Sequence, residues 1–235
     1  MRDFLATGFV LRRYNQAETN RILIFFSQQQ GKLKLMAKGV RKVGSRRAGH
    51  LEPFVLTRLH LHRGRTFDIV TTAEAQKVYD LDFSNLEQIS LGYLFLEMVD
   101  KTAVEHQKNQ AIFELLQESF GWLSSRDDSK LLRIYFCVKL LQALGNQPNL
   151  DVQQGQKHYL SYDDGRVLAT KPAGPAGEIS IEVIKLWRLV YSHNFSVVKR
   201  VSVDSKQLDL AQNLLDKYFQ YHFGLSFRSS SILKQ

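Results

Sequence analysis

The spacing of apolar residues changes once along this chain, near residue 84, and this change constrains the fold more than any other feature. Before it, short runs of branched and aromatic residues are separated by turn residues, and after it apolar residues recur every three or four positions. The first pattern is typical of strands and the second of helices. We therefore predict an α+β protein with a strand domain at residues 1–80 and a helical domain at residues 81–235.

Five strand-like runs occupy the first domain, and five strands in so short a segment predict a small closed barrel. In the fourth run Arg58 and His60 lie on the face opposite the leucines, and in the third run Lys32 and Lys34 do the same. We therefore expect basic rows on the outside of the barrel. The expected strands are Phe9–Arg13, Arg21–Phe26, Leu33–Ala37, Val55–His62 and Phe67–Thr72.

The second domain contains five helical segments. Ser84 and Glu87 form a capping-box pattern ahead of the first, and Asp127 or Asp128 would cap the third, which Gly145 would end. The expected helices are 84–99, Gln110–Leu123, Ser129–Leu144, Ile181–Ser192 and Lys206–Tyr221, and the apolar stripe of the first is Leu86, Ile89, Tyr93, Leu96 and Val99.

A short β-hairpin interrupts the helices within an insertion at about residues 151–178. Tyr159–Tyr162 and Arg166–Ala169 flank the turn Asp163-Asp164-Gly165, and Asp-Gly favours a type I′ turn. The Pro- and Gly-rich segment Lys171–Gly177 that follows is expected to be a loop.

The positive charge is concentrated at the N-terminal end. The chain carries a formal net charge of +9; residues 1–80 hold 15 Lys and Arg against 6 Asp and Glu, while residues 81–235 hold 17 against 17. A one-sided basic balance attracts polyanions and predicts salt-sensitive binding to phosphates or to an acidic partner.

Motifs for catalysis and for metal binding are missing from the sequence. It contains no phosphate-binding loop, zinc-protease helix or nucleophile elbow, and its single thiol, Cys137, falls in an apolar helix. His60 and His62 point the same way, but even with His50 they make a poor zinc set. We therefore expect a protein that is not an enzyme and that holds no cofactor and no metal. The alternative at this point is an enzyme with an unfamiliar active site.

No apolar run could span a bilayer and no signal peptide is apparent, so we expect a cytoplasmic protein.

The candidate site is a set of cations in the strand domain. Five of them fall within ten residues among Gly39, Gly44 and Gly49, and small barrels with cationic grooves and exposed rings bind single-stranded nucleic acid. Tyr14, Phe54 and Phe67 are the candidate rings, and the alternative for each is a place in the hydrophobic core, which is the commoner role of an aromatic ring. The predicted nucleic-acid-binding residues are Lys32, Lys34, Lys38, Arg41, Lys42, Arg46, Arg47, Arg58, Arg63 and Arg65.

These residues resemble the bacterial RecO family, whose N-terminal domain is an OB-fold. The likeness rests on an ordered set of short motifs that covers most of the chain. In the strand domain they are Gly8-Phe9-Val10-Leu11, Glu18, Arg21-Ile22-Leu23, Gly31-Lys32, Ala37-Lys38-Gly39-Val40-Arg41, Ser45-Arg46, Leu51-Glu52-Pro53-Phe54, Arg63-Gly64 and Glu74. In the helical domain they are Leu140-Leu141, Leu144-Gly145, Pro148-Asn149-Leu150, Phe223-Gly224 and Arg228-Ser229.

The resemblance implies a non-enzymatic, nucleoid-associated mediator of recombinational DNA repair. Such a protein binds single- and double-stranded DNA, anneals strands and, with RecR, helps RecA load onto DNA coated by single-strand binding protein. It also implies that the helical domain receives the acidic tail of that protein, for which Lys130, Arg133 and Lys139 are the candidates. Many members carry a four-Cys zinc module where Asp151–Pro172 has no Cys, so the hairpin is expected in its place. The alternative is an OB-fold RNA-binding factor for translation or ribosome assembly, because a cationic groove binds either backbone.

Overall fold

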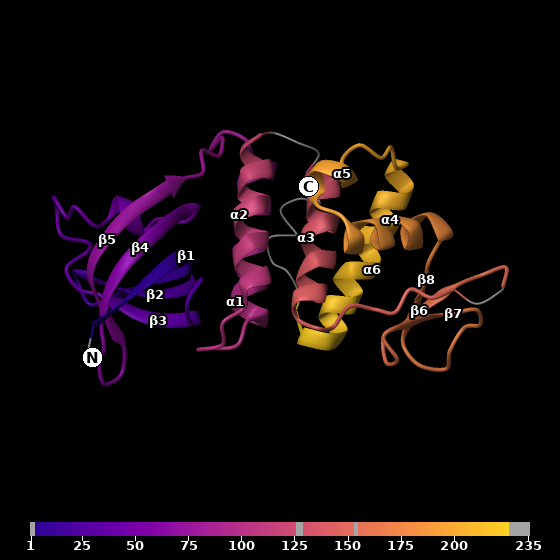
Figure 1. Cartoon of the computed structure of the whole chain (residues 1–235), viewed down its shortest axis with the longest axis horizontal. Coiled ribbons are helices and arrows are strands. Elements are labelled where there is room, and N and C mark those ends of the chain that lie inside the picture. The colour runs from indigo at the N-terminus through magenta and orange to yellow at the C-terminus, as the bar shows by residue number, and fades with distance from the viewer. Residues whose placement is uncertain (1–2, 126–128, 153–154, 226–235) are drawn as a thin grey trace. The chain divides into compact units, whose positions relative to one another are not determined.

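The computed structural model describes residues 3–125, 129–152 and 155–225. The chain divides into two compact units, residues 1–125 and 126–235. A five-stranded barrel begins the first unit and helices dominate the second, so the α+β prediction is confirmed (Figure 1).

The barrel has the strand order β1-β2-β3-β5-β4, and β4 closes the ring against β1. Neighbouring strands are antiparallel except β3 and β5, which are parallel and pair at two positions only. This five-stranded closed arrangement is consistent with the OB-fold. The strands are β1 (Asp3–Gln16), β2 (Asn20–Ser27), β3 (Gly31–Ala37), β4 (Val55–His62) and β5 (Asp68–Val78).

A bulge in β1 decides which side chains face the barrel core. The register with β2 shifts between Val10 and Arg12, so Val10 points inward while Arg12 points outward two residues later. The interior is apolar because the alternate residues of each strand are apolar. It is filled by Ala6, Val10, Leu23, Phe25, Leu33, Leu35, Ala37, Val40, Leu51, Leu59, Leu61 and Val70.

Two helices, α1 (Leu86–Thr102) and α2 (Gln110–Ser124), belong to the same compact unit as the barrel. Phe9, on the outer face of β1, packs its ring 5.3 Å from Phe120 of α2, and Phe54 lies 5.4 Å from the same ring. The change from strands to helices lies near residue 80, as the sequence indicates. The first compact unit nevertheless continues to residue 125, because it includes α1 and α2.

The start of α1 differs from the prediction in two ways. Its N-cap is Asn85, whose side chain accepts a hydrogen bond from the Gln88 backbone, whereas Ser84 donates to Asp82. The predicted stripe is also partly wrong, because Leu86 and Tyr93 are exposed. α1 buries a different face since the barrel and α2 both contact it.

The second unit is built around α3 (Ser129–Ala143), which is buried from Leu131 to Val138. It contacts α4 (Ile181–Ser192) and α6 (Ser205–Phe223), and the short helix α5 (Phe195–Val198) was not predicted. Gly145 ends α3 with a φ of +74°, a left-handed conformation that favours glycine. The proposed caps Asp127 and Asp128 lie outside the described residues.

The predicted hairpin is present as β6 (Tyr159–Ser161) and β7 (Arg166–Leu168), but a third strand, β8 (Ala176–Glu178), pairs with β6. The expected loop at Lys171–Gly177 therefore ends in a strand. The type I′ turn is also wrong: four residues connect β6 and β7, and of these only Gly165 has a positive φ, whereas type I′ needs two.

Candidate nucleic-acid interface

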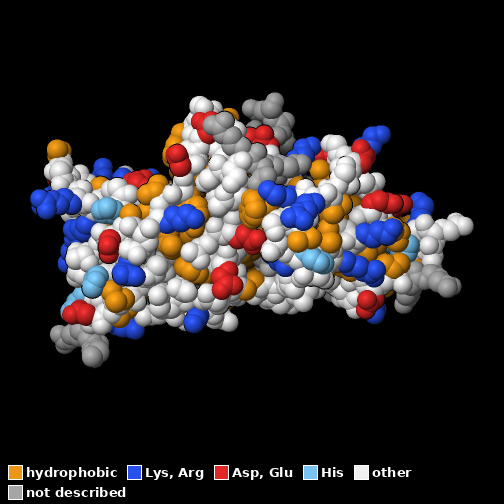
Figure 2. Space-filling view, turned by 45° about the horizontal axis from the view of Figure 1, so that its top comes forward, with side chains coloured by type: hydrophobic (Ala, Val, Ile, Leu, Met, Phe, Trp, Pro, Cys, Tyr) orange, Lys and Arg blue, Asp and Glu red, His pale blue; other side chains and the backbone are white. Residues whose placement is uncertain are grey.

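Residues 38–47, between β3 and the 3₁₀ turn Gly49–Leu51, form a series of turns that we call the basic loop. Lys38, Arg41, Lys42 and Arg46 are all exposed on it. Figure 2 shows Lys and Arg side chains gathered at the left end of the barrel. The basic loop therefore presents several cations to solvent within a short distance along the chain.

Hydrogen bonds hold the basic loop against the barrel. Arg47 donates from Nη1 to the carbonyl of Val70, at 2.8 Å, and from Nη2 to that of Lys38, at 2.7 Å. Arg41 donates from its backbone to Thr19 and from Nη1 to the carbonyl of Ala17, in the β1–β2 turn. Arg47 thus organises the loop, whereas Lys38, Lys42 and Arg46 extend from it.

The other predicted cations have different surroundings. Lys34 lies 5.1 Å from the Phe67 ring centroid, and Arg63 lies 4.8 Å from that of Phe4, both cation–π distances. Arg58 and Arg65 are exposed on β4 and on the β4–β5 turn. Lys32 is half-buried and donates from Nζ to the Asp100 carbonyl, which gives it a structural bond within the unit.

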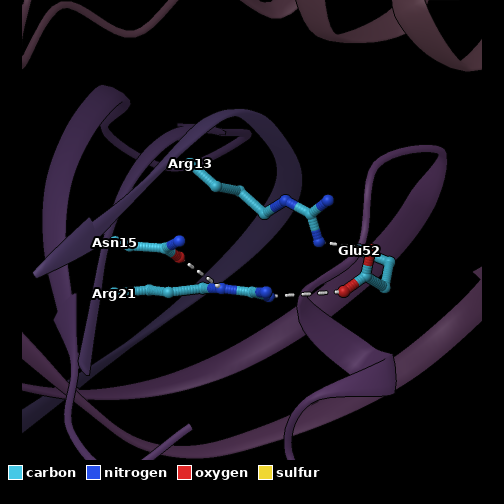
Figure 3. A network of polar contacts seen from close by, with 4 residues as sticks. All are labelled: Arg13, Asn15, Arg21 and Glu52. Atoms are coloured by element: carbon cyan, nitrogen blue, oxygen red, sulfur yellow. Dashed lines mark hydrogen bonds and ion pairs between the residues drawn. The ribbon is translucent and has the colours of Figure 1, made fainter. Parts of the chain in front are cut away.

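Three arginines outside the predicted set also lie at the barrel surface. Arg12 pairs with the Asp100 carboxylate at 3.0 Å and lies 4.7 Å from the Tyr14 ring centroid. Arg13 and Arg21 share the carboxylate of Glu52, which the second reaches at 3.5 Å (Figure 3). The sequence signal for these residues was weak, because Arg12 and Arg13 are adjacent and the bulge between Val10 and Arg12 decides which of them faces outward.

The three candidate rings separate in the structure. Phe54 is 2% exposed and packs edge-on against Tyr93 and Phe120, so it is a core residue. Tyr14 is 40% exposed and Phe67 is half-buried, so both present part of their rings to solvent.

The even charge balance of residues 81–235 conceals two opposite parts. Residues 81–125, with α1 and α2, hold 2 Lys and Arg against 7 Asp and Glu, whereas residues 126–235 hold 15 against 10. The basic barrel thus shares its unit with acidic helices, and the second unit is moderately basic. Several of its cations are paired internally.

The predicted partner-binding residues have internal contacts. Arg133 is 3% exposed and donates to Asp216 of α6 at 2.7 Å, and Lys130 pairs with Asp209 at 2.9 Å. Lys139 donates to the carbonyl of Tyr191. The neighbouring apolar side chains of α3 are buried. Arg133 therefore cannot meet an incoming carboxylate while its pair is intact, and the partner role of these three residues stays a prediction.

The described residues do not offer a site that suits zinc. No group of three or more His, Cys, Asp or Glu among them could hold a metal ion. Cys137 is buried, and burial raises the pKa of its thiol to about 12, so the thiolate that zinc requires is disfavoured. The Nδ1 of His62 lies 2.6 Å from the Asp3 carboxylate, so this ring nitrogen already has a partner.

In the described parts of the chain no helix is long and apolar enough to cross a membrane.

Comparisons with known proteins agree with this architecture. The family model described as "Recombination protein O N terminal" matches residues 1–79, and "Recombination protein O C terminal" matches residues 84–231. A relative from an Exiguobacterium strain named "DNA repair protein RecO" is 26% identical over 97% of this chain and 94% of its own length. Proteins of the same name are 25% identical in Moorella thermoacetica, over 99% of this chain and 91% of the relative, and 30% identical in Desulforamulus reducens, over 64% and 58%. The chain therefore belongs to the RecO family of DNA repair proteins.

Proposed function

We propose that this protein is a non-enzymatic recombination mediator that binds single- and double-stranded DNA and anneals complementary strands. The exposed cations Lys38, Lys42 and Arg46 on an OB-fold barrel are the observation that carries the proposal. Cations that neutralise the phosphates of two strands lower the repulsion between them. Pairing is accelerated in this way without any residue that makes or breaks a covalent bond.

The family supports the wider role. We propose that, together with RecR, the protein helps RecA load onto single-stranded DNA coated by single-strand binding protein, and that it acts on the bacterial nucleoid. The acidic tail of single-strand binding protein would bind the helical unit, whose excess of cations suits an acidic peptide. The ion pairs of Lys130 and Arg133 mean that this tail needs cations elsewhere on the unit, or the opening of a pair.

An annealing assay tests the proposal. Two complementary oligonucleotides, one coated with single-strand binding protein, are mixed with and without the protein, and duplex formation is followed by energy transfer between their labels. We expect faster pairing that slows as salt is added, because phosphate contacts release counterions. If the pairing rate at low salt is the same with and without the protein, the proposed annealing activity is contradicted.

A matched comparison of DNA and RNA oligonucleotides separates the proposal from an RNA-binding function. Preference for RNA requires contacts to the 2′-hydroxyl. Tighter binding to DNA or equal binding fits a mediator, whereas markedly tighter binding to RNA would favour a translation or ribosome-assembly factor.

A further inference from the structure

A row of apolar side chains crosses the outer face of four neighbouring strands. Tyr14 of β1 is opposite Ile22 of β2, Ile22 is opposite Met36 of β3, and Met36 is opposite Ile69 of β5. Directly opposed residues lie on the same face of a sheet. These four residues, which we call the outer row, therefore form one continuous line across β1, β2, β3 and β5.

The outer row faces away from the barrel core and is accessible. The residues beside it in sequence, Leu23 and Leu35, fill the interior, so the alternation of strands turns the outer row outward. Tyr14 is 40% exposed, and the other three are half-buried. The guanidinium of Arg12 lies 4.7 Å from the centroid of the Tyr14 ring, and part of that ring is open to solvent.

Cations flank the outer row on both sides. On one side Arg12 lies over the Tyr14 ring, fixed by its pair with Asp100, and Lys34 lies over Phe67. On the other side β3 ends one residue after Met36, and the basic loop begins at Lys38, bonded through Arg41 to the β1–β2 turn. The row spans three strand spacings of about 4.8 Å each.

We propose that the outer row binds the unpaired bases of single-stranded DNA, with Tyr14 as the stacking ring. Apolar and aromatic side chains favour the flat faces of bases, and cations on either side favour the phosphates that join them. A duplex keeps its bases stacked inside, so it uses the cations without the row. This inference rests on the proposed DNA-binding function and assigns it a separate base-binding surface.

Oligonucleotides that lack bases provide the test. The probes are an oligothymidylate of about 12 nucleotides, within the range bound by one OB-fold, and an abasic strand of the same length and charge. We expect the parent protein to bind the first more tightly, by roughly tenfold for one stacked base. Tyr14→Ser should remove most of that difference, whereas Tyr221→Ser, an exposed tyrosine of the second unit, should leave it unchanged.

A second variant reports on the contact directly. Tyr14→Trp keeps an aromatic ring, so its affinity should be retained, and its added fluorescence should be quenched by oligothymidylate and not by the abasic strand. Absence of quenching, or an unaltered preference in Tyr14→Ser, would overturn the inference. If the parent binds both strands equally well, only the base-binding surface is wrong; if it binds neither, the proposed function fails as well.

Discussion

Arg47 donates a 2.7 Å hydrogen bond from its Nη2 to the backbone carbonyl of Lys38, so the end of the basic loop is tied to its beginning. The same guanidinium reaches the carbonyl of Val70 in β5. A planar group with several donors suits this task, because it satisfies carbonyls in fixed directions at once. Arg47 therefore sets the shape in which the neighbouring cations are presented.

Replacing Arg47 should loosen the basic loop. In Arg47→Gln three carbonyl contacts are lost, and we expect faster cleavage within residues 38–47 in limited proteolysis by trypsin. Arg46→Gln, at an exposed neighbour, should leave the cleavage rate at the remaining sites unchanged. If the two variants are cleaved alike, Arg47 does not organise the loop.

The ion pair between Arg133 and Asp216 should matter for stability. Arg133 is 3% exposed and the Asp216 side chain is 24% exposed, so Arg133→Met removes a buried cation that pairs with a partly buried carboxylate. We expect the free energy of unfolding in urea to fall by about 3 kcal/mol.

Lys130→Met is the matched control, because the pair of Lys130 with Asp209 is about half exposed at both ends. Surface pairs of this kind contribute less than about 1 kcal/mol. Equal losses in the two variants would show that burial of the Arg133 pair is unimportant.

Zinc should be absent from the purified protein. The stretch Asp151–Pro172 has no Cys, and a structural zinc would add folding free energy that chelation removes. Elemental analysis of protein purified without a chelator should find far less than one zinc per chain, and a chelator should leave the melting temperature unchanged. One zinc per chain would refute the prediction.

Acid should destabilise the second unit through His222. Burial lowers the pKa of His222 below its usual value of 6.5, although the Tyr162 backbone and Asp163 act in the opposite direction. Since the unfolded chain then binds the proton more tightly, this contribution is fully present above pH 6.5 and is lost as the pH falls toward the lowered pKa. Tyr218, whose ring lies 4.2 Å from the imidazole, keeps its proton throughout because burial raises its pKa to about 12.

His222→Phe keeps a ring beside Tyr218 but cannot titrate. The melting temperature of the parent should therefore fall more than that of His222→Phe as the pH is lowered from 7.5 through the ordinary histidine pKa of 6.5, because the lowered pKa of His222 makes folding less favourable there. Parallel curves would show that His222 does not contribute to the acid sensitivity.

The sequence predicts the elements well where one period is clear. α4 was predicted with its observed bounds, and β4 likewise, because each has a regular pattern and clear ends. Two short elements were not predicted: α5 has four residues, and β8 contains Gly177 within a Gly-rich segment. Elements this short carry too few residues to establish a period. The equally short strands β6 and β7 were predicted because the Asp-Gly turn between them marks a hairpin.

The candidate site was predicted in composition but not in arrangement. Four cations of the basic loop, Lys38, Arg41, Lys42 and Arg46, are exposed, as a run of charged residues among glycines suggests. The structural roles of Arg47 and Lys32 depend on carbonyls far away in sequence, at Val70 and Asp100. The outer row was hidden because it requires the registers of three strand pairs and the bulge in β1.

The salt dependence of DNA binding tests the central claim most directly. Lys38, Lys42 and Arg46 are replaced together by Gln, and the control replaces Lys171, Lys185 and Lys206, which are exposed cations of the second unit. If the basic loop contacts phosphates, the slope of log affinity against log salt on single strands should flatten by about 0.7 for each lost contact, or about 2 in total. The control should keep the parent slope. A loop variant that is folded and retains the parent slope would contradict the account.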